Sequence, residues 1–352
     1  MAAFVDIFLM LLLIAGTMTV LMVRNLFVAT MLLGIVSFTM ALIFISLDAV
    51  DVAFTEAAVG AGISTVLYIG TLALVGSQEK ERPKLALGPL VICVLVGAIL
   101  YYATYEMPEF GHPENPVQTH VAPRYVEESP TEIGIPNMVT SVLASYRGYD
   151  TFGEVTVIFT AGIGVLLILR QRRRKRTEAE KDAKDTPLDE NRGGKGSSLS
   201  GLGSAHDLVP HVIAKLLIPF IFVFGLYVQF HGDFGPGGGF QAGVIFAAGI
   251  ILYALVFSLD LARAVISEKA ILFLISAGVV LYGGVGVVSM LLGGNFLDYN
   301  VLASDPIAGQ HIGILLVELG VGITVTAAML AIFYAFVGRA DLIEEAAQRG
   351  EN

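Results

Sequence analysis

The sequence predicts an all-α polytopic membrane protein with about nine transmembrane helices, on three observations. Hydrophobic residues make up 55% of the 352 residues and charged residues only 15%. The mean hydropathy is +0.76. Apolar runs recur near the length of roughly 20 residues that a bilayer-spanning helix needs. The one cysteine lies inside an apolar run, so we expect neither a disulfide framework nor a cysteine metal site. The sequence has no cofactor motif, and we expect no metal, no cofactor and no nucleic-acid partner.

Each predicted span is an apolar run bounded by charged or helix-breaking residues. In chain order the spans cover 4–23, 26–47, 52–76, 86–104, 152–169, 210–230, 240–258, 270–292 and 308–337. If the first span runs from outside to inside, only Arg124 and Arg147 among the basic residues fall on the outer side. The positive-inside rule therefore predicts a multi-pass protein with its N-terminus outside and its linker and C-terminus in the cytoplasm. We expect it in the cell (plasma) membrane.

The spans divide into five and four around a polar segment, which gives a 5 + 4 arrangement. Residues 1–84 are predicted to form a three-helix domain, and 85–170 a two-helix domain with an acidic outward loop. Residues 206–352 are predicted to form a four-helix domain. Between them, 171–205 are charged and then rich in Gly and Ser, which is typical of a flexible tether on the cytoplasmic side.

The outward loop, 105–137, carries six glutamates and several prolines. The prolines exclude a long helix there. The glutamates either concentrate cations near an external opening or are simply solvated. The following stretch has Asn137 as a helix cap and apolar residues at helical spacing, Val139, Val142, Leu143 and Tyr146. It predicts a short amphipathic helix on the outer face of the membrane.

Two carboxylates inside apolar runs are the first candidates for an ion or proton pathway, because a charge within a span needs a partner, a proton or water. Glu56 lies about one turn into the third span and precedes a run of small residues. It is either a buried, proton-exchanging group or an interfacial side chain that reaches the surface. Glu318 lies about ten residues into the ninth span. It either carries ions or protons, or makes a structural hydrogen bond to a neighbouring helix.

A second acidic pair opens the fifth span. Asp150 and Glu154 are spaced to share a helical face, and Arg147 precedes Asp150 by three residues. Both acids also suit the positive end of a helix. They are therefore candidates for an ion pathway and equally for a local structural cluster.

A glycine-rich segment, HGDFGPGGGFQAG, covers 231–243 between the sixth and seventh spans. It lacks the Gly-Lys-Ser/Thr ending of a phosphate-binding loop and the preceding strand of a dinucleotide fold. Its structural glycines, Gly235, Gly237, Gly238 and Gly239, permit a tight reversal and close approach of backbone to neighbouring helices. Its polar side chains, His231, Asp233 and Gln241, are candidates for lining a hydrated pocket.

These motifs resemble those of a known family. The last four spans resemble MnhB, the B subunit of the Mrp-type (Mnh) multisubunit monovalent cation/proton antiporters, through FHGDFGPGGGFQAGVIFAAGIIL and GILLVELGVGITV. Residues 1–84 resemble the small MbhD-like domain near the C-terminus of the large Mrp protein MrpA, through DVAFTEAAVGAG. The next domain resembles the two-span MbhE-like domain that follows it there, through SVLASYRGYDTFGE.

The resemblance implies a non-enzymatic subunit of a Na⁺/H⁺ antiporter that contributes to the ion pathway and joins antiporter-like large subunits and small membrane subunits. Its other partners would be Na⁺, H⁺ and the bilayer. The antiporter-like part of MrpA, with its central lysines, has no counterpart here, so we expect no transport by this chain alone. Similar pieces occur in energy-converting hydrogenases and ferredoxin-driven pumps. Membership of such a redox-driven complex is one alternative, and a purely structural scaffold is another.

Overall fold

The computed structural model describes residues 2–79, 87–184 and 208–348, and within these ranges it contains nine helical stretches long and apolar enough to cross a membrane. They confirm the predicted all-α membrane fold. The spans are formed by α1 (Ala2–Met22), α2 (Leu26–Ser46), α3 with η1 and α4 (Val50–Glu56, Ala57–Ile63 and Ser64–Val75), α5 (Leu87–Thr104), α9 (Gly148–Lys184), α10 (Leu208–His231), α11 (Gly239–Phe257), α13 (Glu268–Leu291) and α14 (Pro306–Gln348).

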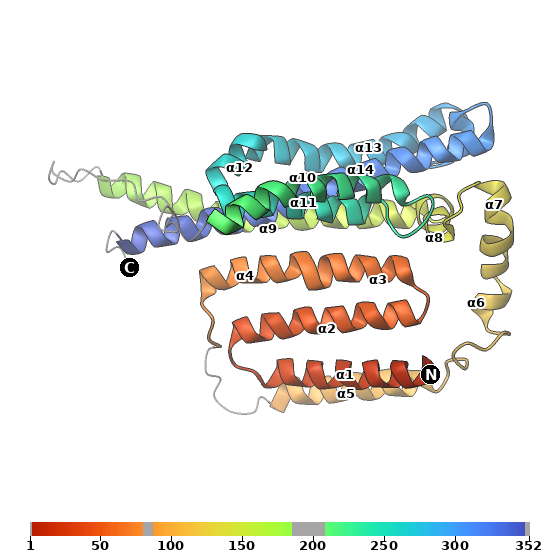
Figure 1. Ribbon diagram of the computed structural model, residues 1–352, viewed down its shortest axis with the longest axis horizontal. Helices are drawn as coiled ribbons and strands as arrows, with labels where there is room; N and C mark the ends of the chain where they lie inside the picture. The colour runs from red at the N-terminus through yellow and green to blue at the C-terminus, as the bar shows by residue number, and fades with distance from the viewer. Residues whose placement is uncertain (1, 80–86, 185–207, 349–352) are drawn as a thin grey trace.

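The spans form two groups that meet along one seam (Figure 1). In the first group, α1, α2 and the α3–α4 stretch pack side by side. In the second, α14 is central and packs against α13, α11 and α9. The seam joins α4 to α14 and η1 to α11. Buried side chains of the second group, such as Ile275 and Ile314, are fully enclosed, so apolar packing between helices holds this group together.

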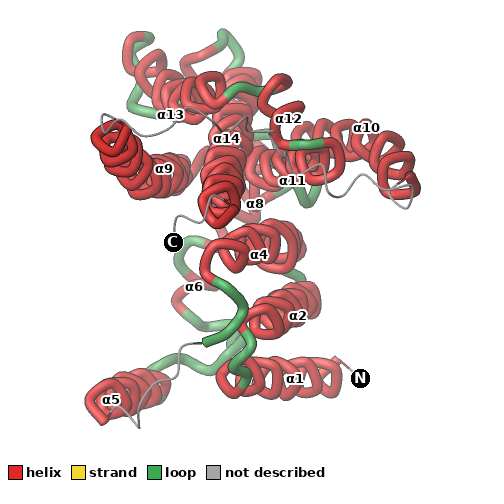
Figure 2. The backbone as a smooth tube through the Cα atoms, turned by 90° about the vertical axis from the view of Figure 1, so that its left-hand side faces the viewer, coloured by secondary structure: helices red, strands yellow, loops and turns green. Residues whose placement is uncertain are grey.

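The two spans of residues 85–170 do not pack on each other. Helix α9 lies against α13 and α14 in the second group. Helix α5 stands apart from the column of other helices (Figure 2), and none of its residues is buried. The 5 + 4 division of the sequence remains a prediction, because packing in space does not follow chain order.

One correction concerns the predicted tether. Helix α9 continues as far as Lys184, whereas the sequence predicts flexible chain from residue 171. The segment from 171 to 184 is rich in Arg, Lys, Glu and Ala, all good helix formers, so the transmembrane helix extends into it. The rest of the predicted tether, 185–205, lies outside the described residues.

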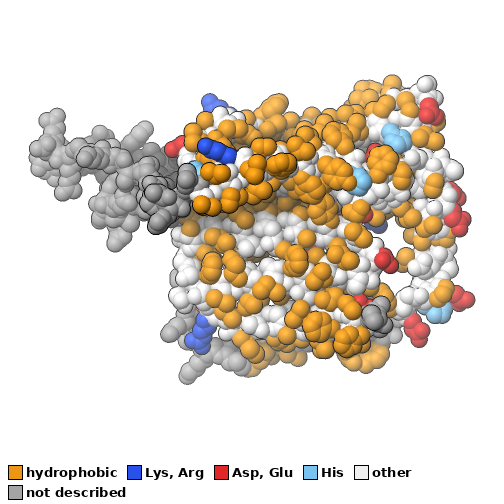
Figure 3. Space-filling view, in the orientation of Figure 1, with side chains coloured by type: hydrophobic (Ala, Val, Ile, Leu, Met, Phe, Trp, Pro, Cys, Tyr) orange, Lys and Arg blue, Asp and Glu red, His pale blue; other side chains and the backbone are white. Residues whose placement is uncertain are grey.

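The charged side chains gather at opposite ends of the helices. On the face shown in Figure 3, Asp and Glu are mostly at the end where α7 (Ser129–Glu132) and α8 (Met138–Thr140) lie, and Lys and Arg are at the other end, with apolar side chains between. The apolar band matches what a bilayer requires.

The acidic loop 105–137 contains short helical pieces, α6 (Pro116–Thr119), η2 (Arg124–Glu128) and α7, as its prolines predict. The next stretch, α8 and η3 (Ser141–Tyr146), is helical and capped by the Asn137 side chain. Its buried face consists of Thr140, Ser141 and Ala144. The apolar side chains Val139 and Leu143 are exposed, so the small polar face packs on protein and the apolar face is free to meet lipid.

A salt-bridged clamp holds the acidic loop to η3. The Tyr146 hydroxyl donates to Glu132, and Arg124 donates to the other Glu132 oxygen at 2.8 Å. The Tyr146 hydrogen bond lowers the pKa of Glu132, against the raising effect of burial. Burial, aided by the bond to Glu132, raises the pKa of Tyr146 to about 12.

Replacing Glu132 by Gln is expected to loosen the loop by about 1 kcal/mol, the net value of one hydrogen-bonded pair. A carboxyl with a lowered pKa stabilises the folded loop above its ordinary value of 4.5, and that contribution is lost as the pH falls through the lowered pKa. Hydrogen exchange of 124–132 should therefore accelerate in the variant at pH 7 and converge with wild type in acid. The exposed Glu127 replaced by Gln serves as control, and equal acceleration there would contradict the clamp.

Candidate functional site

The glycine-rich segment folds into a tight loop over α14. It begins with hydrogen bonds from the amides of Phe234 and Gly235 to the carbonyl of His231, at 2.9 and 3.0 Å. It closes with a 3.0 Å bond from the Gly238 amide to the carbonyl of Val228. Gly238 has a φ of +113°, a conformation that favours glycine strongly. The loop thus returns to the end of α10 directly before α11 begins.

The side chain of Glu318 lies beneath this loop. A Cβ atom on Gly238 would lie 3.0 Å from Glu318 Oε1, and one on Gly232 would lie 3.2 Å from Oε2. A Cβ atom on Gly239 would lie only 1.9 Å from the Glu318 carbonyl oxygen. The glycines therefore leave room for a carboxylate and its backbone, and this explains why the sequence places them there.

Glu318 is partly buried at this position. Two other carboxylates, Asp233 and Asp51, lie within electrostatic range of it. Among the described residues, no protein hydrogen bond to the Glu318 carboxylate is formed. Three acidic groups from a loop, α3 and α14 thus share one region, which favours the presence of a proton or cation there.

Gln241 connects this region to the first group of helices. Its Nε2 donates to Thr55 Oγ1 at 2.8 Å, and its Oε1 faces Gly238 from the same side as the Glu318 carboxylate. Thr55 in turn donates to the carbonyl of Asp51 at 3.0 Å. Polar groups of α3, α11 and α14 therefore follow one another across the seam between the two groups of helices.

The third span changes from α to π geometry directly after Glu56, over the seven residues of η1. Such π segments inside α-helices occur frequently at functional sites. The Glu56 carboxylate points toward α2, because a Cβ atom on Gly60 would lie 2.5 Å from Glu56 Oε1 and 2.6 Å from Ser37 Oγ. Glu56 and Glu318 thus face different helices, and Thr55, adjacent to Glu56, makes the contact with Gln241.

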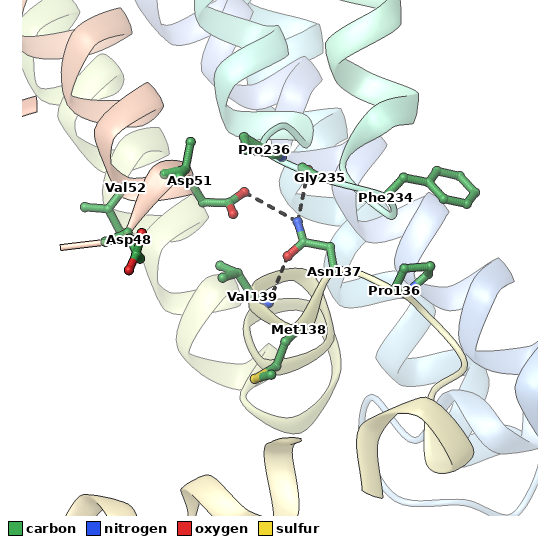
Figure 4. Close-up of a pocket in the computed structure, with 12 residues that line it drawn as sticks. Asp48, Asp51, Val52, Pro136, Asn137, Met138, Val139, Phe234, Gly235 and Pro236 are labelled. Atoms are coloured by element: carbon green, nitrogen blue, oxygen red, sulfur yellow. Dashed lines mark hydrogen bonds between the residues drawn. The ribbon is translucent and has the colours of Figure 1, made fainter. Parts of the chain in front are cut away.

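A pocket of about 350 Å³ opens beside this region. Its lining combines Asp48 and Asp51 with the backbone and side chains of 136–139 and of Phe234–Pro236 (Figure 4). Asn137 projects into the centre of the view. Its Nδ2 donates to the carbonyls of Gly232 at 2.9 Å and Gly235 at 3.0 Å, and its backbone amide donates to the carbonyl of Asp233 at 3.0 Å. Asn137 therefore fixes the glycine loop from outside.

Replacing Asn137 by Leu is expected to destabilise the glycine loop by about 2 kcal/mol, because two carbonyls lose a donor and the helix loses its cap. Hydrogen exchange over 232–238 should accelerate. Thr140 donates a single bond to the carbonyl of Gly232, at 2.6 Å, so Thr140→Val provides a graded comparison with a smaller effect. An equal effect of the two variants would contradict the assignment of Asn137 as the principal loop anchor.

Asp233 lies at the edge of the loop, with its Oδ2 4.0 Å from Nδ1 of His311. Burial raises the pKa of Asp233, and the charge of a protonated His311 opposes this effect. His231 stacks on Tyr227 with ring centroids 4.8 Å apart and lies beside Gly235. None of the three polar side chains predicted to line a pocket belongs to the lining of the pocket described above. Gln241 and Asp233 instead lie near Glu318, and His231 packs against its own helix.

The acids of the fifth span lie elsewhere. Asp150 forms an ion pair with Arg147 at 2.5 Å on an exposed surface. Glu154 is exposed on α9. No hydrogen bond or ion pair of the described residues joins either acid to Glu318. Within 2–79, 87–184 and 208–348, no group of three or more His, Cys, Asp or Glu side chains is arranged to hold a metal ion.

Sequence reasoning missed the roles of two residues. Thr55 is an uncharged residue in an apolar run, and only its polarity within a span could have singled it out. Asn137 was expected only as a helix cap, although it also anchors the glycine loop. The π segment has no signal in composition beyond its small residues.

Three family models match successive parts of the chain. Residues 209–331 match MnhB, the domain related to the MnhB subunit of the Na⁺/H⁺ antiporter. Residues 11–77 match MbhD, the D subunit of MBH, and residues 87–185 match MbhE, the E subunit of MBH. The loop over Glu318 thus belongs to the MnhB-related part, while the pocket also takes residues from the two other parts.

Individual relatives agree with these models. The putative antiporter subunit mnhB2 of Staphylococcus aureus (strain Newman) is 31% identical over 137 residues, which are 38% of this chain and 96% of the relative. The structure of the Mrp complex from Dietzia sp. DQ12-45-1b matches with a TM-score of 0.70 and 27% identity. That match covers 92% of this chain and 34% of the other, so the chain spans about a third of the length of the Mrp chain it matches.

A second solved structure, the membrane-bound sulfane sulfur reductase, an archaeal respiratory membrane complex, matches 70% of this chain with a TM-score of 0.49 and 26% identity.

The resemblances expected from the sequence motifs are confirmed by the three family models. Because the chain covers almost the whole length of mnhB2 with 31% identity, it belongs to the MnhB family of Na⁺/H⁺ antiporter subunits.

Proposed function

We propose that this chain is a membrane subunit of a multisubunit Na⁺/H⁺ antiporter and that Glu318 belongs to its ion or proton pathway. The observation that supports the proposal is the placement of Glu318 within a span, under a loop whose glycines leave room for its carboxylate. A carboxylate at such depth is costly unless it binds a proton or a cation. The chain belongs to the MnhB family of Na⁺/H⁺ antiporter subunits, so the proposed transport is exchange of Na⁺ for H⁺.

The pocket beside Asp51 and Asn137 is the proposed approach to Glu318. It supplies carboxylates at the end of the bundle where acidic side chains gather, and Thr55 and Gln241 provide polar groups between the pocket and Glu318. The distribution of basic residues supports placing this end outside the cell and the C-terminus in the cytoplasm. We infer that Glu56, beside the π segment, has a separate role, since it faces α2.

The domains predicted to be bounded at 84, 170 and 205 contribute different residues to the proposed pathway. The MnhB-related helices carry Glu318, and the MbhD-related helices supply Asp51, Thr55 and Glu56. Antiporter-like large subunits and small membrane subunits are the proposed partners. The chain is expected to transport nothing alone, because none of its lysines lies near the middle of a span.

The test is purification of the complex from native membranes through a C-terminal tag, in mild detergent, with mass spectrometry of every stoichiometric component. Antiporter-like subunits are expected, and vesicles from cells lacking this chain should lose Na⁺/H⁺ exchange until the full chain is restored. Stoichiometric iron–sulfur subunits would instead assign the chain to a redox-driven complex. A chain that purifies alone would contradict both assignments.

A further inference from the structure

The side chain of Gln229 is buried without a hydrogen-bond partner for its Nε2 group. Only 4% of the residue is exposed, and the Nε2 atom has no partner. Other buried glutamines of the described chain are paired, as Gln310 shows by accepting from Ser145 and donating to Asn300. A buried unsatisfied donor lowers stability, so its presence calls for a specific reason.

Gln229 lies next to the Glu318 site. A Cβ atom on Gly322 would lie 2.7 Å from Gln229 Oε1 and 3.2 Å from the carbonyl oxygen of Gly239. Gly322 is one turn beyond Glu318 on the same face of α14. The Gln229 amide thus lies at the junction of α10, α11 and α14, beside the residue of α14 that is one helical turn beyond Glu318.

The backbone beside Gln229 is also part of the loop that covers Glu318. The carbonyl of the preceding residue, Val228, accepts the Gly238 amide at 3.0 Å, and Gly238 lies against the Glu318 carboxylate. The residue before Gln229 is therefore joined to the loop that covers Glu318. The amide has a free donor, and the carboxylate accepts no hydrogen bond from the described protein.

We propose that Gln229 is a further residue of the pathway and that its side-chain amide holds a water molecule against Glu318. This inference rests on the proposed role of Glu318. Water fits because it accepts the free Nε2–H and at the same time donates to a carboxylate, and buried waters typically make about three such bonds. A hydrated carboxylate can then take up or release a proton or a monovalent cation without being fully desolvated.

The test compares Gln229→Leu with Gln310→Leu in the assembled complex. Because Gln229 Nε2 has no protein partner, Gln229→Leu strands no protein donor or acceptor and should change thermal stability little. Removing the paired Gln310 strands Ser145 and Asn300 and should lower thermal stability. Exchange per assembled complex should fall at least about tenfold in Gln229→Leu, the effect of one lost hydrogen bond to a charged group. It should stay near wild type in Gln310→Leu.

Gln229→Asn provides the conservative comparison, because it keeps an amide N–H donor on a side chain one methylene shorter. It should retain more exchange than Gln229→Leu. The proposal is overturned if Gln229→Leu exchanges normally, fails to assemble, or loses as much stability as Gln310→Leu. A structure of the assembled complex with a protein acceptor on Gln229 Nε2 would overturn it as well.

Glu318→Gln, measured in parallel, separates this inference from the proposed function. If Glu318→Gln abolishes exchange and Gln229→Leu does not, only the role of Gln229 is lost. If Glu318→Gln exchanges normally, the proposed pathway through Glu318 is wrong, and the proposed role of Gln229 is wrong with it.

Discussion

Replacing Glu318 by Gln is expected to lower Na⁺/H⁺ exchange by about a hundredfold or more, the scale of losing a positioned proton-transfer group. The amide keeps the size of the side chain beneath the glycine loop but can neither release a proton nor balance a cation. Assembly should persist, because an uncharged group costs less to bury in a span. Exchange is measured in vesicles as the sodium-dependent change of an internal pH dye.

The matched control is Asp260→Asn, another carboxylate-to-amide change. Asp260 has a side chain that is 92% exposed and lies on α12 (Leu259–Val265), at the opposite end of the second group (Figure 1). Its replacement should leave exchange unchanged. Normal exchange in a fully assembled Glu318→Gln complex would favour the scaffold alternative, in which the carboxylates of the chain are structural.

Replacing Gly239 by Ala is expected to destabilise the chain by about 3 kcal/mol or more, at the upper end of the cost of overpacking. The new Cβ atom would lie 1.9 Å from the Glu318 carbonyl oxygen, which is backbone and cannot rotate away. Helices α11 and α14 would have to move apart, and this movement would displace the loop that covers Glu318. Thermal unfolding in detergent and the yield of assembled complex provide the measurement.

Gly284→Ala is the control for this second prediction. Gly284 lies in α13, and a Cβ atom there would have no neighbour within 4 Å. Its replacement should be neutral or stabilise by up to about 1 kcal/mol, the difference in helix propensity between Gly and Ala. Similar losses in both variants would mean that the close approach at Gly239 is not what holds α11 against α14.

The sequence predicted the transmembrane fold well because hydrophobic length and breakers are local signals. All nine predicted spans overlap helices of the described chain. It also identified the glycine segment and Glu318, since a carboxylate in an apolar run and repeated glycines in a membrane protein are both unusual. That these two features form one site required the fold, because Glu318 lies 75 residues beyond the end of the segment 231–243.

Other features depend on packing and could not be predicted. The direction of the Glu56 side chain depends on the packing of α3 and η1 against α2, which cannot be read from hydropathy. Helix α9 packs against α13 and α14, although several other helices also present apolar faces. Tertiary packing decides between these faces, and no local sequence signal does. The same holds for Gln229, whose burial and missing partner appear only when three helices are placed together.

The pocket around Asn137 draws on the MbhD-related, MbhE-related and MnhB-related parts, and one polypeptide carries all three. Covalent linkage keeps these parts at a high effective concentration, so their association does not depend on how much of each is synthesised. Every particle also receives them in equal number. A weak polar contact such as Thr55–Gln241 can therefore persist here at an affinity too low to hold separate proteins together.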